Sequence, residues 1–271
     1  MHKVFLFLAL LSLSANADES ANKPAEDFTK DSDWGFVALV TYGPRTIEGT
    51  IFENRAGGPT SGGATAEALG LGTEDSFVYA LGFRYKKWNF TLDYMPTQYS
   101  GDGVATIGID MGNGNVIAID TPITTTINVD LTLVNVMYDA YVGKYGKFAV
   151  GIGAGQTNID IALVPQIGQP VKFKGTTPFG FLAISYNKRF GKFLLTAAAQ
   201  GVSLATNDSS MDYTNLNLMG GYVFYTSSKW RSELVIGYRH VGFVFDYEVN
   251  GNVSDTDVTL VGPYLGFIVG F

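Results

Sequence analysis

Apolar residues recur at every second position through most of the chain beyond residue 33. The first example runs from Trp34 to Tyr42, where one face of an extended chain carries Trp34, Phe36, Ala38, Val40 and Tyr42. Successive side chains of a strand point to opposite faces, so this spacing predicts strands and argues against helices. Aromatic residues at both ends of such a face, with small residues between them, are typical of strands that cross a bilayer.

The alternation repeats often enough to predict an all-β fold, a transmembrane antiparallel up-and-down β-barrel of about ten strands. A closed barrel pairs its backbone groups internally, so it needs neither an apolar helix nor a disulfide, and this chain contains no cysteine. We expect the strands around residues 34–42, 77–85, 88–94, 127–142, 148–155, a segment ending near 186, 193–204, 212–225, 230–245 and 257–271.

The connections between these strands alternate in length, which predicts short periplasmic turns and long extracellular loops. A hairpin turn at Gly112 to Asn115 falls inside one long connection, and we expect this hairpin to stand above the membrane. As two further wall strands it would raise the count to twelve, and eight strands is the other alternative. The short turns are expected near residues 86, 145, 189 and 228, and the long loops at 43–75, 99–126, 156–177, 205–211 and 247–256.

The first seventeen residues have the layout of a cleavable signal peptide. Lys3 supplies a positive charge, an apolar run covers Val4 to Leu13, and Ala15-Asn16-Ala17 matches the small-x-small cleavage pattern. The run is too short for a membrane-spanning helix, which takes about twenty apolar residues. We therefore expect a signal peptide at 1–17, a polar periplasmic tail at 18–33, and a transmembrane barrel with long extracellular loops at 34–271.

The far end of the chain carries a second export feature. The last residue is Phe271, and Val269, Phe267 and Leu265 share its face of the final strand. This alternation resembles the C-terminal assembly signal of bacterial outer-membrane barrels. The resemblance implies a Gram-negative outer membrane and recognition by the barrel-assembly machinery. In general composition the chain also resembles the small OmpW-like and OmpA-like barrels, without a close match to either family.

Charge is divided between the two kinds of connection. The formal net charge is −7, with lysines and arginines near the short turns and acids mostly in the long loops. Nucleic-acid binding needs a basic face, so this distribution excludes nucleic acid as a partner. We expect outer-membrane lipid and lipopolysaccharide as the surroundings. The acidic loops are expected to form a solvated surface, and divalent cations that bridge them to lipopolysaccharide are the less favoured alternative. No cofactor is expected, and the sequence identifies no ligand.

Two features that resemble catalytic or cofactor motifs have simpler structural explanations. The omptin proteases, which this barrel resembles in strand number, need a histidine and several aspartates at the barrel mouth. His240 shares the parity of Tyr238 and Ile236, however, so we expect it to face outward. The glycines at 151, 153 and 155 alternate within a strand and lack the turn and helix of a dinucleotide-binding loop. We therefore expect no catalytic, cofactor or metal residues.

The inward-facing positions suggest what fills the barrel. Ionised groups in a narrow lumen must be paired or hydrated, and here three arginines face three carboxylates. We expect these residues to form an ionic network that largely plugs the lumen of a structural or surface-interaction protein. The alternative is a narrow channel for small or apolar solutes, as in OmpW-type barrels, and a barrel enzyme comes third. The six residues, assigned by parity, are Arg84, Asp93, Asp139, Arg231, Glu233 and Arg239.

If the signal peptide is cleaved after Ala17, the exported protein begins at Asp18. N-terminal sequencing of an outer-membrane fraction checks this expectation. An Ala17→Leu variant should stay uncleaved because signal peptidase requires a small residue there. Wild-type protein that still carries Leu10 to Leu13 in the inner membrane would contradict it.

Overall fold

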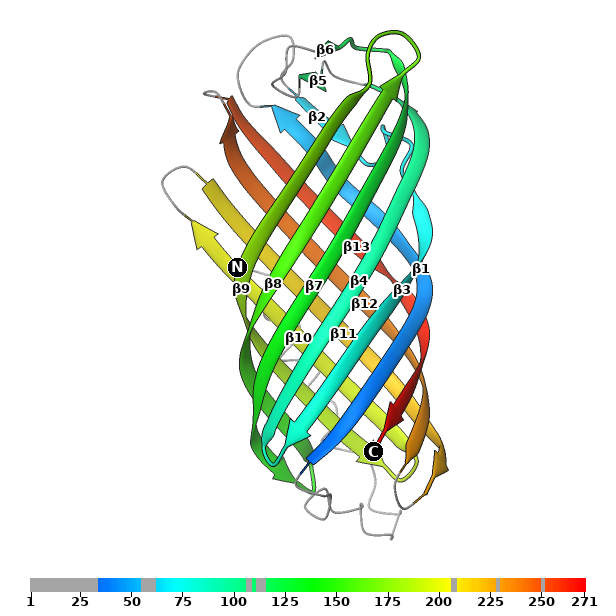
Figure 1. Ribbon diagram of the computed structural model, residues 1–271, viewed down its shortest axis with the longest axis vertical. Helices are drawn as coiled ribbons and strands as arrows, with labels where there is room; N and C mark the ends of the chain where they lie inside the picture. The colour runs from blue at the N-terminus through cyan, green and yellow to red at the C-terminus, as the bar shows by residue number, and fades with distance from the viewer. Residues whose placement is uncertain are drawn as a thin grey trace.

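A computed structural model describes residues 34–54, 62–105, 109–110, 116–205, 209–227, 230–249 and 252–271. In this part of the chain one antiparallel sheet closes into a barrel through the pairing of β13 with β1 (Figure 1). The sheet has eleven strands, of which β2 (Gly62–Thr65) is a short addition and ten form the wall. The wall strands are β1 (Trp34–Asn54), β3 (Thr73–Tyr85), β4 (Trp88–Val104), β7 (Pro122–Gly143), β8 (Gly146–Pro165), β9 (Val171–Phe190), β10 (Phe193–Ala205), β11 (Ser209–Thr226), β12 (Arg231–Val249) and β13 (Asn252–Gly270).

The expected signal peptide at 1–17 and tail at 18–33 lie outside the described residues. Within them, no helix is long and apolar enough to cross a membrane.

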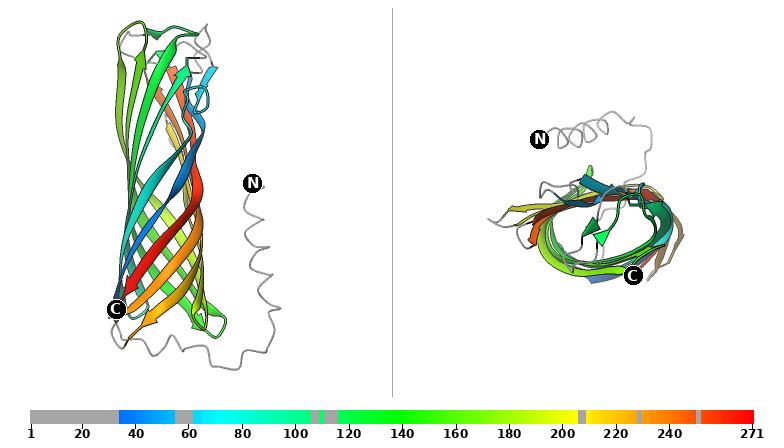
Figure 2. Two further views of the ribbon diagram at one scale, coloured as in Figure 1. Left: turned by 90° about the vertical axis from the view of Figure 1, so that its right-hand side faces the viewer. Right: turned by 90° about the horizontal axis from the view of Figure 1, so that it is seen from above.

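The expected hairpin stands apart from the wall, so ten strands is confirmed over eight or twelve. Its strands β5 (Ile109–Asp110) and β6 (Val116–Ile117) pair only with each other, in a separate sheet. Viewed along the barrel axis, they fall within the outline of the wall (Figure 2). We call the end that carries β2, β5 and β6 the rim, and the opposite end, with the short turns at 86–87, 144–145 and 191–192, the base.

The strands are much longer than expected, which corrects most of the predicted long loops. β1 continues through Asn54, β7 begins at Pro122, and β12 and β13 are separated by only two residues. Outward aromatic residues were the criterion by which the strands were recognised in the sequence. That criterion fails where a strand leaves the membrane, because its outward face then meets water.

Strand β7 shows how the two faces exchange character along one strand. Near the base, Val134 and Tyr138 point outward and are 49% and 37% exposed. Toward the rim the inward residues are apolar and buried, at Ile127, Leu131 and Leu133, while the outward positions are mostly Thr, Asn and Asp. The base half therefore has a lipid-facing exterior, and the rim half has the apolar interior of a water-soluble protein.

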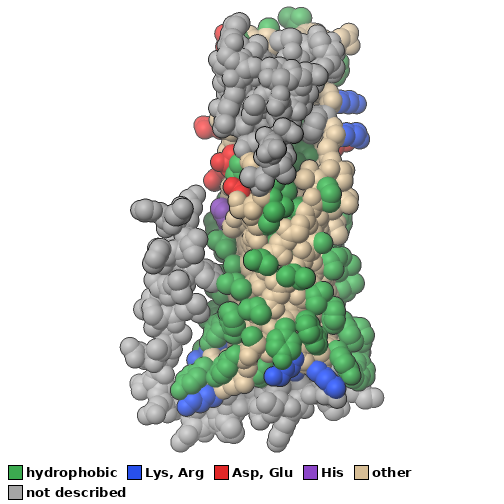
Figure 3. All heavy atoms as spheres, turned by 90° about the vertical axis from the view of Figure 1, so that its left-hand side faces the viewer, with side chains coloured by type: hydrophobic (Ala, Val, Ile, Leu, Met, Phe, Trp, Pro, Cys, Tyr) green, Lys and Arg blue, Asp and Glu red, His purple; other side chains and the backbone are tan. Residues whose placement is uncertain are grey.

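The outer surface carries the same division. Apolar side chains gather over the base half, basic side chains line its lower edge, and charged side chains of both signs appear above it (Figure 3). We call the apolar zone the belt; it includes Trp34 and Tyr42 on β1 and Leu182 and Phe190 on β9, all exposed. A belt of this kind, about 25 Å tall, is what a barrel presents to hydrocarbon.

Pairing between neighbouring strands stops at the upper edge of the belt in two places. β3 and β4 pair from the base only as far as Tyr79 and Tyr94. β9 and β10 pair only as far as Leu182 and Gly201, although β9 continues to Val171. Above these points the wall has two seams, and near the rim the turn at 66–70 reaches across the first one, where Val104 N donates to Ala68 O at 3.0 Å.

Phe271 lies where the barrel closes. Its backbone exchanges two hydrogen bonds with Phe36, of 2.8 and 3.0 Å, and its ring lies 5.3 Å from that of Phe36. The ring centroid of Trp230 is 4.8 Å away on the other side. Leu265, Phe267 and Val269 of the proposed assembly signal lie on the same strand and pair with β1. Their recognition by the assembly machinery stays a prediction.

We expect Phe271→Ala to slow folding and lower the free energy of unfolding by about 1–2 kcal/mol, because it removes ring contacts on both sides of the place where β13 meets β1. The gel shift between heated and unheated samples measures the folded fraction over time. Phe190→Ala is the matched control, since Phe190 is also an exposed belt aromatic at the base but lies away from the pairing of β13 with β1. Equal folding of both variants would mean that Phe271 has no special role.

Candidate functional site

The lumen near the base contains a buried carboxylate held by two arginines. Glu233 of β12 is fully buried, and its Oε1 lies 2.6 Å from Arg231 Nε and 3.1 Å from Arg189 Nη2. Arg231 and Glu233 are two residues apart on one strand, so they face the same way, as parity predicts. Arg189 comes from the end of β9, three strands away along the wall. This group links the two sides of the barrel just above its base.

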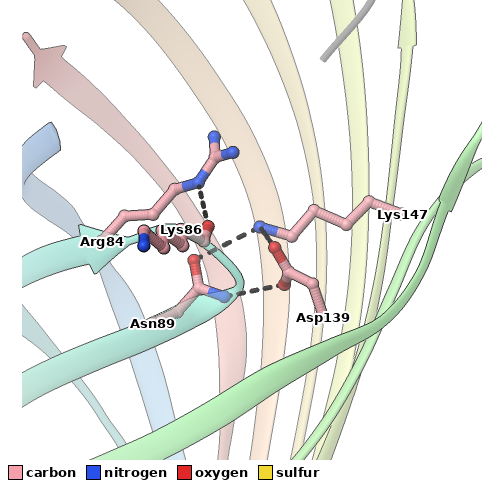
Figure 4. Close-up of polar contacts among 5 residues, drawn as sticks. All are labelled: Arg84, Lys86, Asn89, Asp139 and Lys147. Carbon is pink, nitrogen blue, oxygen red and sulfur yellow. Dashed lines mark hydrogen bonds and ion pairs between the residues drawn. The ribbon is translucent and has the colours of Figure 1, made fainter. Parts of the chain in front are cut away.

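A second buried carboxylate lies on β7. Asp139 Oδ2 is 2.8 Å from Lys147 Nζ, and Asp139 Oδ1 accepts a hydrogen bond of 2.7 Å from Asn89 Nδ2 (Figure 4). Lys147 also donates to Asn89 Oδ1 at 3.2 Å. Arg84 lies beside this group and donates from Nε to the backbone oxygen of Lys86 at 3.1 Å. Three strands, β4, β7 and β8, are thereby joined on their inner faces.

The six residues expected to form one network lie in separate groups. Arg231 and Glu233 are brought together, whereas Asp139 is paired with Lys147 and Arg84 contacts a backbone carbonyl. Arg239 and Asp93 lie higher in the lumen, where Asp93 acts electrostatically on Arg239 but the structure records no ion pair between them among the described residues.

Lys147 and Arg189, which pair with these two buried carboxylates, were not predicted as members of the lumen network. Both lie beside short turns, and they were grouped with the other turn cations. Parity would have identified them, because Lys147 shares the face of Ala149 and Arg189 that of Phe181, and both of those residues are buried. A charged residue on the inward parity of a barrel strand is the signal, even when a turn is adjacent.

Midway along the lumen, amide side chains form a layer of hydrogen bonds. Asn135 of β7 donates to Thr91 Oγ1 at 3.0 Å and accepts from Gln200 Nε2 of β10 at 3.0 Å. Gln200 Oε1 then accepts from Asn215 Nδ2 at 2.9 Å and from Tyr213 OH at 3.0 Å. β8 and β9 separate β7 from β10 in the wall, so this contact crosses the lumen. We call these five residues the amide layer.

The alternating glycines of β8 make room for aromatic rings inside the barrel. A Cβ on Gly153 would lie 2.3 Å from the ring of Phe181, and one on Gly155 would lie 2.4 Å from that of Phe179. Both rings pack on Tyr213, with centroids 5.6 and 4.6 Å away. The glycines therefore serve packing within a strand, as expected, and do not form a phosphate-binding loop.

His240 lies on β12 with the parity of the belt residue Tyr238, and its neighbours in sequence, Arg239 and Val241, have the inward parity. Within the described ranges, no three His, Asp or Glu side chains gather closely enough to hold a metal ion.

No protein-family model and no curated protein matches this sequence. Among solved structures, the outer-membrane protease OmpT from Escherichia coli is similar in fold, with a TM-score of 0.51, 10% identity and coverage of 88% of this chain and 96% of that one. The translocator domain of the autotransporter NalP from Neisseria meningitidis gives a TM-score of 0.36, with 12% identity over 100% and 95% of the two chains. The toluene transporter TodX of P. putida gives 0.27, with 9% identity over 89% and 90%. The chain has the fold of a Gram-negative outer-membrane β-barrel, and its belt places it in that membrane.

Glu233→Gln should lower the free energy of unfolding by about 3 kcal/mol, because it leaves the largely buried Arg189 without a carboxylate away from water and removes the partner of Arg231. Urea unfolding followed by tryptophan fluorescence measures the change. Glu48→Gln is the matched control, since Glu48 lies exposed on the outer face of β1. An equal and small effect of both substitutions would show that the buried pairs add nothing to stability.

Proposed function

We propose that this protein is a non-conducting outer-membrane barrel of structural or surface-interaction type, whose lumen is largely plugged by its own side chains. The observation that carries this proposal is the meeting of side chains from strands that are not neighbours in the wall. Gln200 reaches Asn135 across β8 and β9, and Arg239 of β12 reaches Met95 of β4 across three intervening strands, at 3.0 Å.

The plug has three parts at successive heights. Ion pairs around Glu233 and Asp139 occupy the base, the amide layer lies above them, and an apolar core fills the rim half. A ten-stranded barrel is only slightly wider than one that its side chains fill completely. A hydrated ion would have to displace contacts in all three parts, which argues for a closed lumen.

The rim half is then the part that acts on the surroundings. Its exterior is polar and includes exposed lysines of β9, where Lys174 pairs with Asp160 of β8 at 2.6 Å. On this proposal, the rim half stands in the lipopolysaccharide layer and presents a rigid polar surface. Phe271 and the final strand β13 would be the feature that the barrel-assembly machinery recognises.

A narrow channel for small or apolar solutes is the second candidate, and one observation favours it. The seam between β9 and β10 begins beside Phe179 and Phe181, whose buried rings would line a path entered from the side. An enzyme is the third candidate. The likeness to a protease concerns the fold alone, and the outward parity of His240 argues against an active site.

In planar bilayers, the wild-type protein should show no steady conductance. A variant that combines Arg189→Gly, Gln200→Gly and Phe181→Gly removes one obstacle from each part of the plug and should conduct. A control with Leu182→Gly and Leu195→Gly, two exposed belt residues, should stay closed. The gel shift of unheated samples verifies folding of each variant.

Regular current steps from the wild type would overturn the plug in favour of an ion path. Uptake of an apolar dye into vesicles, without current, would favour the second candidate. Cleavage of a peptide that is lost in His240→Ala would favour the third.

A further inference from the structure

Two arginines converge on one small area of the inner wall. Arg239 donates from Nη1 to Met95 Sδ at 3.0 Å, and Arg45 of β1 donates from Nη1 to Thr97 Oγ1 at 3.5 Å. Met95 and Thr97 are alternate residues of β4, so they point the same way and stand about 7 Å apart. The two guanidinium groups therefore occupy the same part of the lumen, close enough to act on each other electrostatically.

A glycine of β13 lies between the two arginines in the wall. Gly262 is the partner of Arg239 in the pairing of β12 with β13. A Cβ added to Gly262 would lie 3.2 Å from the Cα of Arg45 and 2.0 Å from the backbone oxygen of Pro44. Arg239, Gly262 and Arg45 thus form a row across three strands, in which the glycine lets the backbone of β1 approach closely.

The hydrogen-bond acceptors of these two arginines are weak, although Arg239, which is only partly buried, also has its guanidinium carbon 5.7 Å from the ring centroid of Tyr264. A thioether sulfur is a poor acceptor, and 3.5 Å is at the limit of hydrogen-bond distance. Arg45 is only 7% exposed, and none of the ion pairs recorded among the described residues includes Arg45 or Arg239. Asp93 acts on Arg239 from two residues further along β4. Two guanidinium groups that lack a carboxylate in contact are expensive to bury.

Three further polar atoms at this level have no partner among the described residues, and each can donate a hydrogen bond. They are Arg239 Nε, Tyr99 OH and Ser76 Oγ. Tyr99 follows Thr97 on the inner face of β4 and is fully buried, and it interacts electrostatically with both Arg45 and Glu74. Ser76 is 5% exposed and lies on β3, two residues from Glu74, the pairing partner of Arg45. A group of unpartnered donors calls for an acceptor.

We propose that a small oxyanion, a carboxylate or a phosphate, binds between Arg45 and Arg239 as a resident part of the lumen. Its oxygens accept hydrogen bonds from both guanidinium groups and from the hydroxyls of Tyr99 and Ser76. Arginine forks match the geometry of carboxylate and phosphate oxygens, and charge-assisted bonds of this kind are about twice as strong as neutral ones. The anion enters during folding, so the site requires no open channel.

The test compares barrels refolded in detergent at one ionic strength, in sodium chloride alone, with acetate, or with inorganic phosphate. Thermal unfolding of the wild type should move upward by about 5 °C in the salt whose anion binds, at an excess of about one hundred over its dissociation constant. Arg45→Gln and Arg239→Gln should lose this shift. Arg231→Gln is the matched control and should keep it, because Arg231 lies at the base beside Glu233.

Phosphate stabilises many proteins by exclusion from their surface, so the readout is the difference between wild type and variants in the same salt. A second measurement needs no variant: ¹³C-labelled acetate or ³¹P phosphate should show an NMR signal that stays with the washed, folded barrel. A wild type that unfolds at one temperature in all three salts, and retains no anion, would overturn the site. Bilayer conductance is a separate measurement, so either proposal can fail alone.

Discussion

A chain without apolar helices can cross hydrocarbon only if every backbone N–H and C=O is paired within the wall. In this protein that requirement is met by the pairing of β13 with β1, where the backbone and ring contacts of Phe271 complete the circle. The belt, the narrow lumen and the contacts between distant strands all follow from this closure. Residues far apart in sequence, such as Arg189 and Glu233, meet because the circle brings β9 and β12 to face each other.

The interior changes in chemical character with height because each strand passes through two solvents. Where lipid surrounds the wall, the outward face is apolar, and the charged and amide groups of the chain are turned inward. Where water surrounds the wall, the same strand turns its apolar residues inward. The change falls between Leu133 and Val134 on β7, at the height of Asn135 and the amide layer. Amides suit this level since they can donate to and accept from one another without leaving a charge beside the apolar core.

The number of wall strands could be predicted because lipid-facing aromatic residues mark each crossing. The ends of the strands could not, since that mark disappears where β1 and β7 rise above the belt. Parity alone was enough to predict that Arg231 and Glu233 lie on the same face and close together. It could not pair Asp139 with Lys147, because a turn was expected there, and Arg45 fell inside a predicted loop. Contacts such as Arg239 with Met95 depend on how far the closed sheet is sheared, which no local pattern records.

The two seams divide the rim half into separate sheets. Above Leu182 and Tyr79, β4, β7, β8 and β9 remain paired with one another, as do β10 to β13 with β1 and β3. With apolar residues filling the space between them, the rim half is in effect a β-sandwich continuous with a barrel below. The two layers are held by packing and, at the first seam, by the hydrogen bond from Val104 to the turn at 66–70, so they can repack and diverge in sequence without breaking the ring of hydrogen bonds in the bilayer. The sequence of the rim half can therefore change as freely as that of a soluble domain, while the ring of paired strands in the bilayer keeps its structure.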